Sequence, residues 1–206
     1  MVTEIRVYVE GGGECRGQQS PLREGFSQFF DGLVSEARAR QVRWSLIACG
    51  SRGEAYRDFT IALRQHPDAF NVLLVDSEGP VNGGPCRHLE SRDKWPLSGI
   101  ADERCHLMVQ MMEAWFVADA EALKKFYGDG FNANALPKNP NVEEIDKKDL
   151  EKALKQATDK TTKGEYAKIR HAAKLLGLLN VDRVRRASVH CARLFSVLSA
   201  KIAEPA

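Results

Sequence analysis

The sequence of 206 residues has no apolar run near the roughly 18 residues that a membrane-spanning helix needs. Its first residues also lack the basic-then-apolar pattern of a secretory signal. The five cysteines are scattered and include no Cys-x-x-Cys pair, which argues against a disulfide framework and against a structural zinc site. Because 43% of the residues are hydrophobic and 28% are charged, the chain can bury a core. We expect a soluble, cytoplasmic protein with no membrane association.

Two common nucleotide-binding motifs are missing as well. Three glycines stand at residues 11–13, but no Gly-Lys-Ser/Thr follows them, so they are not a Walker loop. They are not a dinucleotide-binding fingerprint either, because Arg16 stands where the third glycine of that motif belongs. We interpret them as a tight turn, and a small-molecule phosphotransferase has no support from motifs.

The first 76 residues alternate between strand and helix patterns. Ser51, with Glu54 three residues later, has the spacing of a capping box at a helix start. The nearly continuous apolar run at residues 70–76 is typical of a strand covered on both faces of a parallel sheet. Strands are expected at residues 4–10, 43–49 and 70–76, and helices at 21–41 and 51–66.

The rest of the chain divides into a loop, one more strand and several helices. Residues 79–104 hold seven glycines and prolines and are expected to form a long loop, either functional or partly disordered. A Gly-, Asn- and Pro-rich stretch at 128–146 is expected to be a linker or lid. A fourth strand is expected at 105–111, and helices at 113–119, 120–127, 147–159, 166–176 and 188–202.

These patterns together predict an α/β fold. We expect an open, mainly parallel sheet of about four strands flanked by helices, followed by a helical C-terminal tail. We place the α/β core at residues 1–127 and a basic helical C-terminal subdomain, packed on the core, at residues 128–206.

Charge is distributed unevenly along the chain. Residues 1–123 carry 13 Lys and Arg against 18 Asp and Glu, whereas residues 124–206 carry 17 against 10. A basic part of this kind favours contact with a polyanion such as nucleic acid, although ordinary solvated helix faces explain it equally well. The residues we expect to bind nucleic acid are Lys163, Lys168, Arg170 and His171.

Four acidic residues lie at or just after the ends of expected strands. Glu10 ends the first strand, Asp76 ends the third, and Glu78 and Glu113 follow the third and fourth. If the first and third strands are neighbours, three of these carboxylates converge where ligands bind in open α/β sheets. Two carboxylates about 4 Å apart repel by about 1 kcal/mol in water and about 4 kcal/mol near a protein surface, so such a group needs protons or a cation.

The chemistry of these carboxylates favours a particular ion. Oxygen ligands without Cys or His beside them favour Mg²⁺ or Mn²⁺ over zinc, and such ions serve in phosphodiester cleavage. The alternative is that Glu10 and Asp76 are ordinary strand-end carboxylates and that Glu113 pairs with an arginine. Asp119 is expected to cap a helix rather than to bind a metal.

Four stretches of the sequence together resemble a known family. They are residues 8–14, 75–78, 112–119 and 166–171, and the most distinctive is the Glu-Ala-Trp-x-x-x-Asp pattern that begins at Glu113. The chain is similar to a bacterial Toprim-like family catalogued as domain of unknown function 4276. Toprim domains are the catalytic modules of topoisomerases, bacterial primases and OLD-family nucleases. They bind Mg²⁺ through a Glu after the first strand and an Asp-x-Asp after a later one.

The resemblance implies roles for individual residues. Glu10 matches the Toprim glutamate, a metal ligand or general acid/base, and Asp76 matches the first carboxylate of Asp-x-Asp. Glu78 occupies the second position, where the wider superfamily more often has Asp, and this departure weakens any claim to intact cleavage geometry. Glu113 and Asp119 match acidic positions of the smaller family that carry no assigned role. Because members often occur beside ATPase genes in phage-defence clusters, the resemblance also implies a partner ATPase.

Our hypothesis from the sequence is a Mg²⁺- or Mn²⁺-dependent nuclease with Glu10, Asp76 and Glu78 as catalytic residues and metal ligands. Glu113 would complete the metal site. Tyr8 is expected in a strand and Tyr166 in a helix, so no tyrosine nucleophile is identified and hydrolysis is favoured over transesterification. The alternative is a catalytically silent Toprim-like subunit that binds a partner ATPase or nucleic acid. An exposed edge strand would also allow a homodimer.

Overall fold

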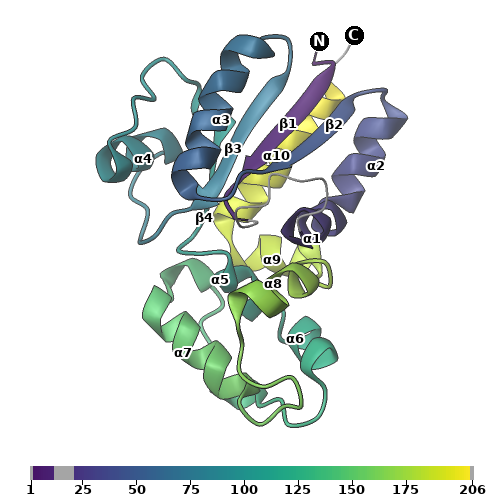
Figure 1. The fold of residues 1–206 in the computed structure, drawn as a ribbon, viewed down its shortest axis with the longest axis vertical. Coiled ribbons are helices and arrows are strands. Elements are labelled where there is room, and N and C mark those ends of the chain that lie inside the picture. The colour runs from purple at the N-terminus through teal and green to yellow at the C-terminus, as the bar shows by residue number, and fades with distance from the viewer. Residues whose placement is uncertain (1, 12–20, 205–206) are drawn as a thin grey trace.

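The computed structural model describes residues 2–11 and 21–204 and shows the expected α/β fold (Figure 1). In this part of the chain an open sheet has the strand order β2-β1-β3-β4, and every neighbouring pair is parallel. The strands are β1 (Glu4–Val9), β2 (Arg43–Ala48), β3 (Phe70–Asp76) and β4 (Cys105–Met108). The adjacency of β1 and β3 on which the expected acidic cluster depends is therefore confirmed.

Helices cover both faces of the sheet, which explains why every residue of strand β3 is buried. On one face, Val72 and Leu74 belong to an apolar cluster with side chains of α1, α2 and α10. On the other face, Leu73 and Val75 pack in a second cluster with side chains of α3 and α4. These helices are α1 (Pro21–Phe29), α2 (Asp31–Ala39), α3 (Arg52–Gln65), α4 (Pro85–Asp93) and α10 (Val189–Ala203).

The remaining helices lie beyond the carboxyl ends of the strands, in the lower part of Figure 1. Helix α8 packs against α1, and α5 contacts both α7 and α8. One apolar cluster runs from β1 through these helices to α10, and the proposed boundary near residue 128 stays a prediction. The helices are α5 (Glu113–Val117), α6 (Ala120–Tyr127), α7 (Lys147–Thr158), α8 (Lys168–Leu176) and α9 (Val181–Ala187).

Several expected boundaries were wrong. The long loop expected at residues 79–104 contains helix α4. The glycines and prolines concealed this helix, because one of the prolines, Pro85, is its first residue. Leu89 is its one large buried apolar side chain, so the sequence shows no apolar periodicity there. The single helix expected at 21–41 is two helices that meet at Phe30. The sequence patterns also missed α9 and extended the fourth strand past its end at Met108.

The stretch at 128–146 is packed rather than a free linker. It contains short 3₁₀ turns at Ala133–Ala135 and Val142–Glu144. Leu136, Val142 and Ile145 are buried in the main apolar cluster, so the stretch is held against the core. Most of the expected glycine turn, with Glu14 and Arg16, lies outside the described residues. None of the described helices combines the length and the apolar character needed to cross a membrane.

The expected capping box at the start of α3 is confirmed and generates a prediction. Ser51 Oγ accepts from the Glu54 amide at 3.3 Å, and a Glu54 side-chain oxygen accepts from the Ser51 amide at 2.9 Å. Replacing Ser51 with alanine should lower the free energy of unfolding by about 1 kcal/mol, measured by urea denaturation. In the control Ser27→Ala, the lost hydroxyl bonds a carbonyl within α1 and caps nothing, so stability should hardly change. Equal losses in both variants would contradict the capping role.

Candidate metal centre

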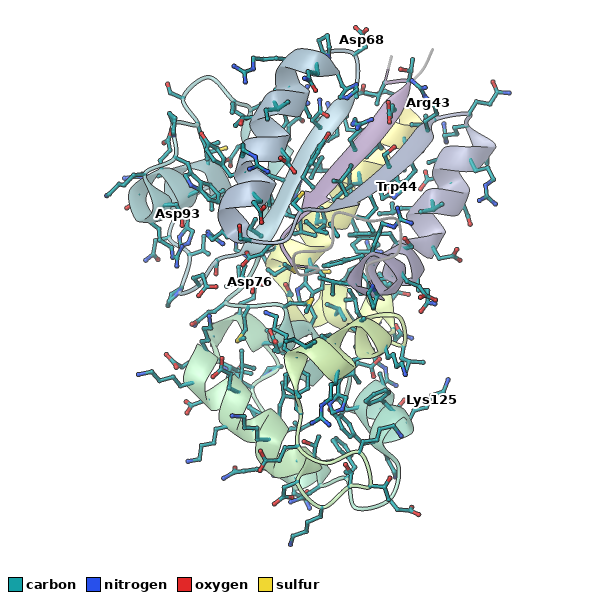
Figure 2. All side chains as sticks on the ribbon, in the orientation of Figure 1. Arg43, Trp44, Asp68, Asp76, Asp93 and Lys125 are labelled. Carbon is teal, nitrogen blue, oxygen red and sulfur yellow. The ribbon has the colours of Figure 1, made fainter. Side chains whose placement is uncertain are left out.

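The pairing of β1 with β3 brings Glu10 and Asp76 together at the carboxyl edge of the sheet. The Glu10 amide donates to the Leu74 carbonyl at 3.1 Å, and Glu10 Oε2 accepts from the Asp76 amide at 3.3 Å. Oxygens of Glu10, Asp76 and Glu78 all lie within 4.8 Å of one another. Figure 2 shows Asp76 at the end of β3, where the sheet meets the helices below it. The three carboxylates can therefore hold one metal ion.

Asp76 is the most deeply buried member of this acidic cluster, with 3% of its surface exposed. Its Oδ1 accepts from the Met112 amide at 2.8 Å, and its Oδ2 lies 3.5 Å from Lys168 Nζ. Burial raises the pKa of Asp76 to about 7, with the charges of Glu10 and Glu113 adding to the rise and Lys168 opposing it. Its carboxyl group is thus balanced between protonated and charged forms near neutral pH.

Glu78 is held by a lysine from the helical part of the molecule. Its amide donates to the Gln110 carbonyl at 2.8 Å, beyond the last paired residues of β3 and β4. Its Oε2 lies 2.5 Å from Nζ of Lys147, the first residue of α7. Burial acts to raise the pKa of Glu78, but the hydrogen bond and charge of Lys147, with the charges of Arg92 and Arg52, leave that pKa below its usual value. Glu78 is therefore ionised.

Glu113, the first residue of α5, is 1% exposed and lies outside the group of three. Its Oε1 accepts from the Tyr166 hydroxyl at 2.8 Å. Its Oε2 has no hydrogen-bond donor among the described residues, and Lys168 Nζ is 3.6 Å away. Because a buried carboxylate oxygen without a hydrogen bond is costly, this atom is available to accept from or coordinate a further ligand.

Arg52 fixes the position of Glu10 and was missed in the sequence. Its Nη1 lies 3.4 Å from Glu10 Oε2 and also contacts the carbonyl oxygen of Asp76. Its Nε and Nη2 donate to both oxygens of Asp93 at 3.0 and 2.7 Å, and the guanidinium lies over the Trp95 ring. The sequence contained a signal for this role, because Arg52 is the first residue of the helix that follows β2. Since β1 and β2 are parallel, Arg52 lies at the same carboxyl edge of the sheet as Glu10. Lys147 gave no such signal.

Of the expected nucleic-acid-binding residues, the structure brings Lys168 alone to the acidic cluster. Lys163 lies over the Phe126 ring, with Nζ 5.2 Å from its centroid, and Arg170 is exposed on α8. His171 is buried, and its Nδ1 accepts from the Tyr127 hydroxyl at 2.9 Å. The four residues therefore do not form one surface around the carboxylates.

Tyr166 lies just before α8, and Asp119 lies just before α6. The helical placement of Tyr166 was wrong, because α8 begins at Lys168. The Tyr166 amide instead donates to Thr158 Oγ1 at 2.7 Å, which directs its hydroxyl to Glu113. Asp119 caps α6 as expected, accepting from the Ala122 amide, and it also pairs with Arg183 at 3.2 Å.

Comparison with known proteins gives one match. A family model described as a domain of unknown function, DUF4276, matches residues 9–199. The chain belongs to the DUF4276 family. No curated protein and no solved structure matches it. The DUF4276 model spans the three carboxylates of the cluster and also Glu113, Arg52, Lys147 and Lys168, so the whole arrangement lies inside the family's own sequence.

The raised pKa of Asp76 predicts a pH-dependent cost to stability. Asp76 has its ordinary pKa near 3.8 in the unfolded chain and about 7 in the folded protein. The folded state therefore binds the proton more tightly, and stability falls as pH rises between these values. In the metal-free protein, Asp76→Asn should gain stability relative to wild type between about pH 5 and about pH 8, by a few kcal/mol at most.

Denaturant unfolding in chelator at the two pH values measures this difference. The matched control is Asp68→Asn, which removes the same charge from an exposed turn and should give no pH-dependent gain. If the difference in free energy of unfolding between Asp76→Asn and wild type were the same at both pH values, the raised pKa of Asp76 would be contradicted.

Proposed function

We propose that this DUF4276 protein is a Mg²⁺- or Mn²⁺-dependent enzyme that hydrolyses phosphodiester bonds of nucleic acid. The observation that carries the proposal is the acidic cluster, whose three carboxylate oxygens lie within 4.8 Å at the carboxyl edge of a parallel sheet. Mg²⁺ takes oxygen ligands at about 2.0–2.1 Å, so opposite ligands stand about 4.2 Å apart. Of three ligands at most one pair can be opposite, and adjacent ligands stand about 2.9 Å apart, so the cluster must close by up to about 2 Å to reach that geometry.

The donor set also fits these ions. Glu10, Asp76 and Glu78 offer oxygen only, which suits Mg²⁺ and Mn²⁺ and does not suit zinc. The Oε2 atom of Glu113, buried without a donor among the described residues, offers a further oxygen nearby. When bound, such an ion polarises a phosphoryl oxygen and supplies a nucleophile at neutral pH.

The protein's own side chains then have defined tasks. Arg52 holds Glu10 in place, and Tyr166 holds one oxygen of Glu113 so that the other stays available. Lys168 Nζ lies between Asp76 and Glu113 on a half-exposed side chain, where it can neutralise negative charge that develops on a reacting phosphate. Loss of the proton of Asp76 near pH 7 prepares the carboxylate for this work in neutral solution.

We further infer that the fold is Toprim-like and that the protein works with a partner ATPase in phage defence. The support is the resemblance of the sequence together with the order of the acidic residues. A Glu follows the first strand, an Asp-x-Glu ends the neighbouring third strand, and both strands lie in one parallel sheet.

A second candidate function is a catalytically silent subunit that binds the ATPase or nucleic acid. One observation favours it, because lysines already accompany the carboxylates. Lys147 Nζ is 2.5 Å from Glu78, and Lys168 Nζ is 3.5 Å from Asp76. In such a protein these ion pairs would stabilise the fold with no need for a metal ion, and Asp76→Asn would leave function intact.

Cleavage of end-labelled single- and double-stranded DNA and RNA separates the two functions. Wild type should cleave in Mg²⁺ or Mn²⁺ and be inactive in chelator, whereas Asp76→Asn should lose at least about 100-fold in rate because it removes a ligand charge. Asp68→Asn is the matched control and should keep full activity, with circular dichroism checking the fold of each variant. Cleavage that survives Asp76→Asn, or no cleavage by wild type in either metal, would contradict the enzyme and favour the silent subunit.

A further inference from the structure

Helix α4 borders a basic hollow whose lining contains none of the residues of the acidic cluster. Its volume is about 610 Å³, and its lining includes Arg87, His88, Ser91 and Arg92 of α4 and Asn82 of the preceding loop. Residues 87, 88 and 91 lie on one face of the helix, and this face borders the hollow. None of the described side chains that line the hollow is acidic, although the first 123 residues carry more acidic than basic groups. The hollow is therefore a local positive site beside a negative one.

Two contacts place the hollow next to the candidate metal centre. His88 Nε2 donates to the carbonyl of Ser77 at 2.9 Å, which ties α4 to the residue between Asp76 and Glu78. Asp93 joins the two sites, because it pairs with Arg92 and also holds Arg52, which reaches Glu10. These contacts therefore link the hollow directly to the acidic cluster.

The arginines of the hollow are available to an anion. Within residues 2–11 and 21–204, Arg87 makes no ion pair or hydrogen bond, and Arg92 is paired with Asp93 through one nitrogen. The amide of Cys86 at the start of α4 is already bonded to Asp102 at 2.9 Å, so binding would fall to the side chains. Guanidinium groups match phosphate oxygens in shape and charge.

We propose that this hollow binds a backbone phosphate of the nucleic-acid strand whose neighbouring phosphodiester lies at the acidic cluster. The assignment rests on the proposed function, because it treats the strand as the substrate. A strand carries a negative charge at every nucleotide, and the carboxylates would repel those charges unless a nearby positive site held the strand. Arg87 and Arg92 provide that site at the end of β3, apart from the basic C-terminal helices.

Strand binding in the absence of metal tests the assignment. The probe is a fluorescent single-stranded DNA or RNA of about 12 nucleotides, titrated with the full chain in EDTA and followed by anisotropy. The double variant Arg87→Ala/Arg92→Ala should weaken binding at least about tenfold. The slope of log K against log salt should become shallower by about 0.7, since one phosphate contact on a single strand is lost.

The control is a double variant that removes two exposed arginines elsewhere, Arg64→Ala on α3 and Arg38→Ala on α2, and it should bind within about twofold of wild type. Equal affinity of the two double variants, or no binding by wild type, would overturn the assignment. Binding of inorganic phosphate as tight as that of the strand would overturn it too, since it would show a site for free phosphate. Failure of the proposed nuclease function can be told apart from failure of this assignment. In that case wild type would show no metal-dependent cleavage, whereas strand binding in EDTA would still depend on the two arginines.

Discussion

The mutual repulsion of carboxylates gathered at one edge of the sheet is the constraint on which the rest of this structure depends. Parallel pairing of β1 with β3 forces Glu10 and Asp76 together, and the burial of Asp76 keeps water from screening them. The fold offsets the repulsion with a basic side chain from each of three helices, namely Arg52 of α3, Lys147 of α7 and Lys168 of α8. Arrangements that concentrate like charge in this way are typical of functional sites.

Two of these three cations come from the helical part of the molecule. Lys147 and Lys168 are the first residues of their helices, so the first turns of α7 and α8 lie near the carboxyl edge of the sheet. The α/β core supplies the negative charges and the helical part supplies two of the positive ones.

The sequence predicted the parts of the site that follow from strand geometry and missed those that follow from tertiary packing. Glu10 and Asp76 could be placed together because parallel strands end at a common edge, and this is confirmed. Tyr166 was misplaced because a buried hydrogen bond to Thr158, which no local pattern reports, delays the start of α8. Helix α4 was missed because it has little apolar periodicity and begins at a proline. The family was identified from short motifs, whereas the Toprim-like likeness stays a prediction.

The most direct test of the central claim is calorimetric titration of the purified protein with Mn²⁺, alongside Glu10→Ala, Asp76→Ala and the exposed control Asp68→Ala. A metal site at the acidic cluster requires that wild type and the control bind the ion and that both cluster variants lose binding, because each removes a ligand from the group of three oxygens. Binding by wild type that is indifferent to Glu10 and Asp76, or no binding at all, would contradict it. In that case Arg52 and the two lysines would balance the carboxylates without a metal ion.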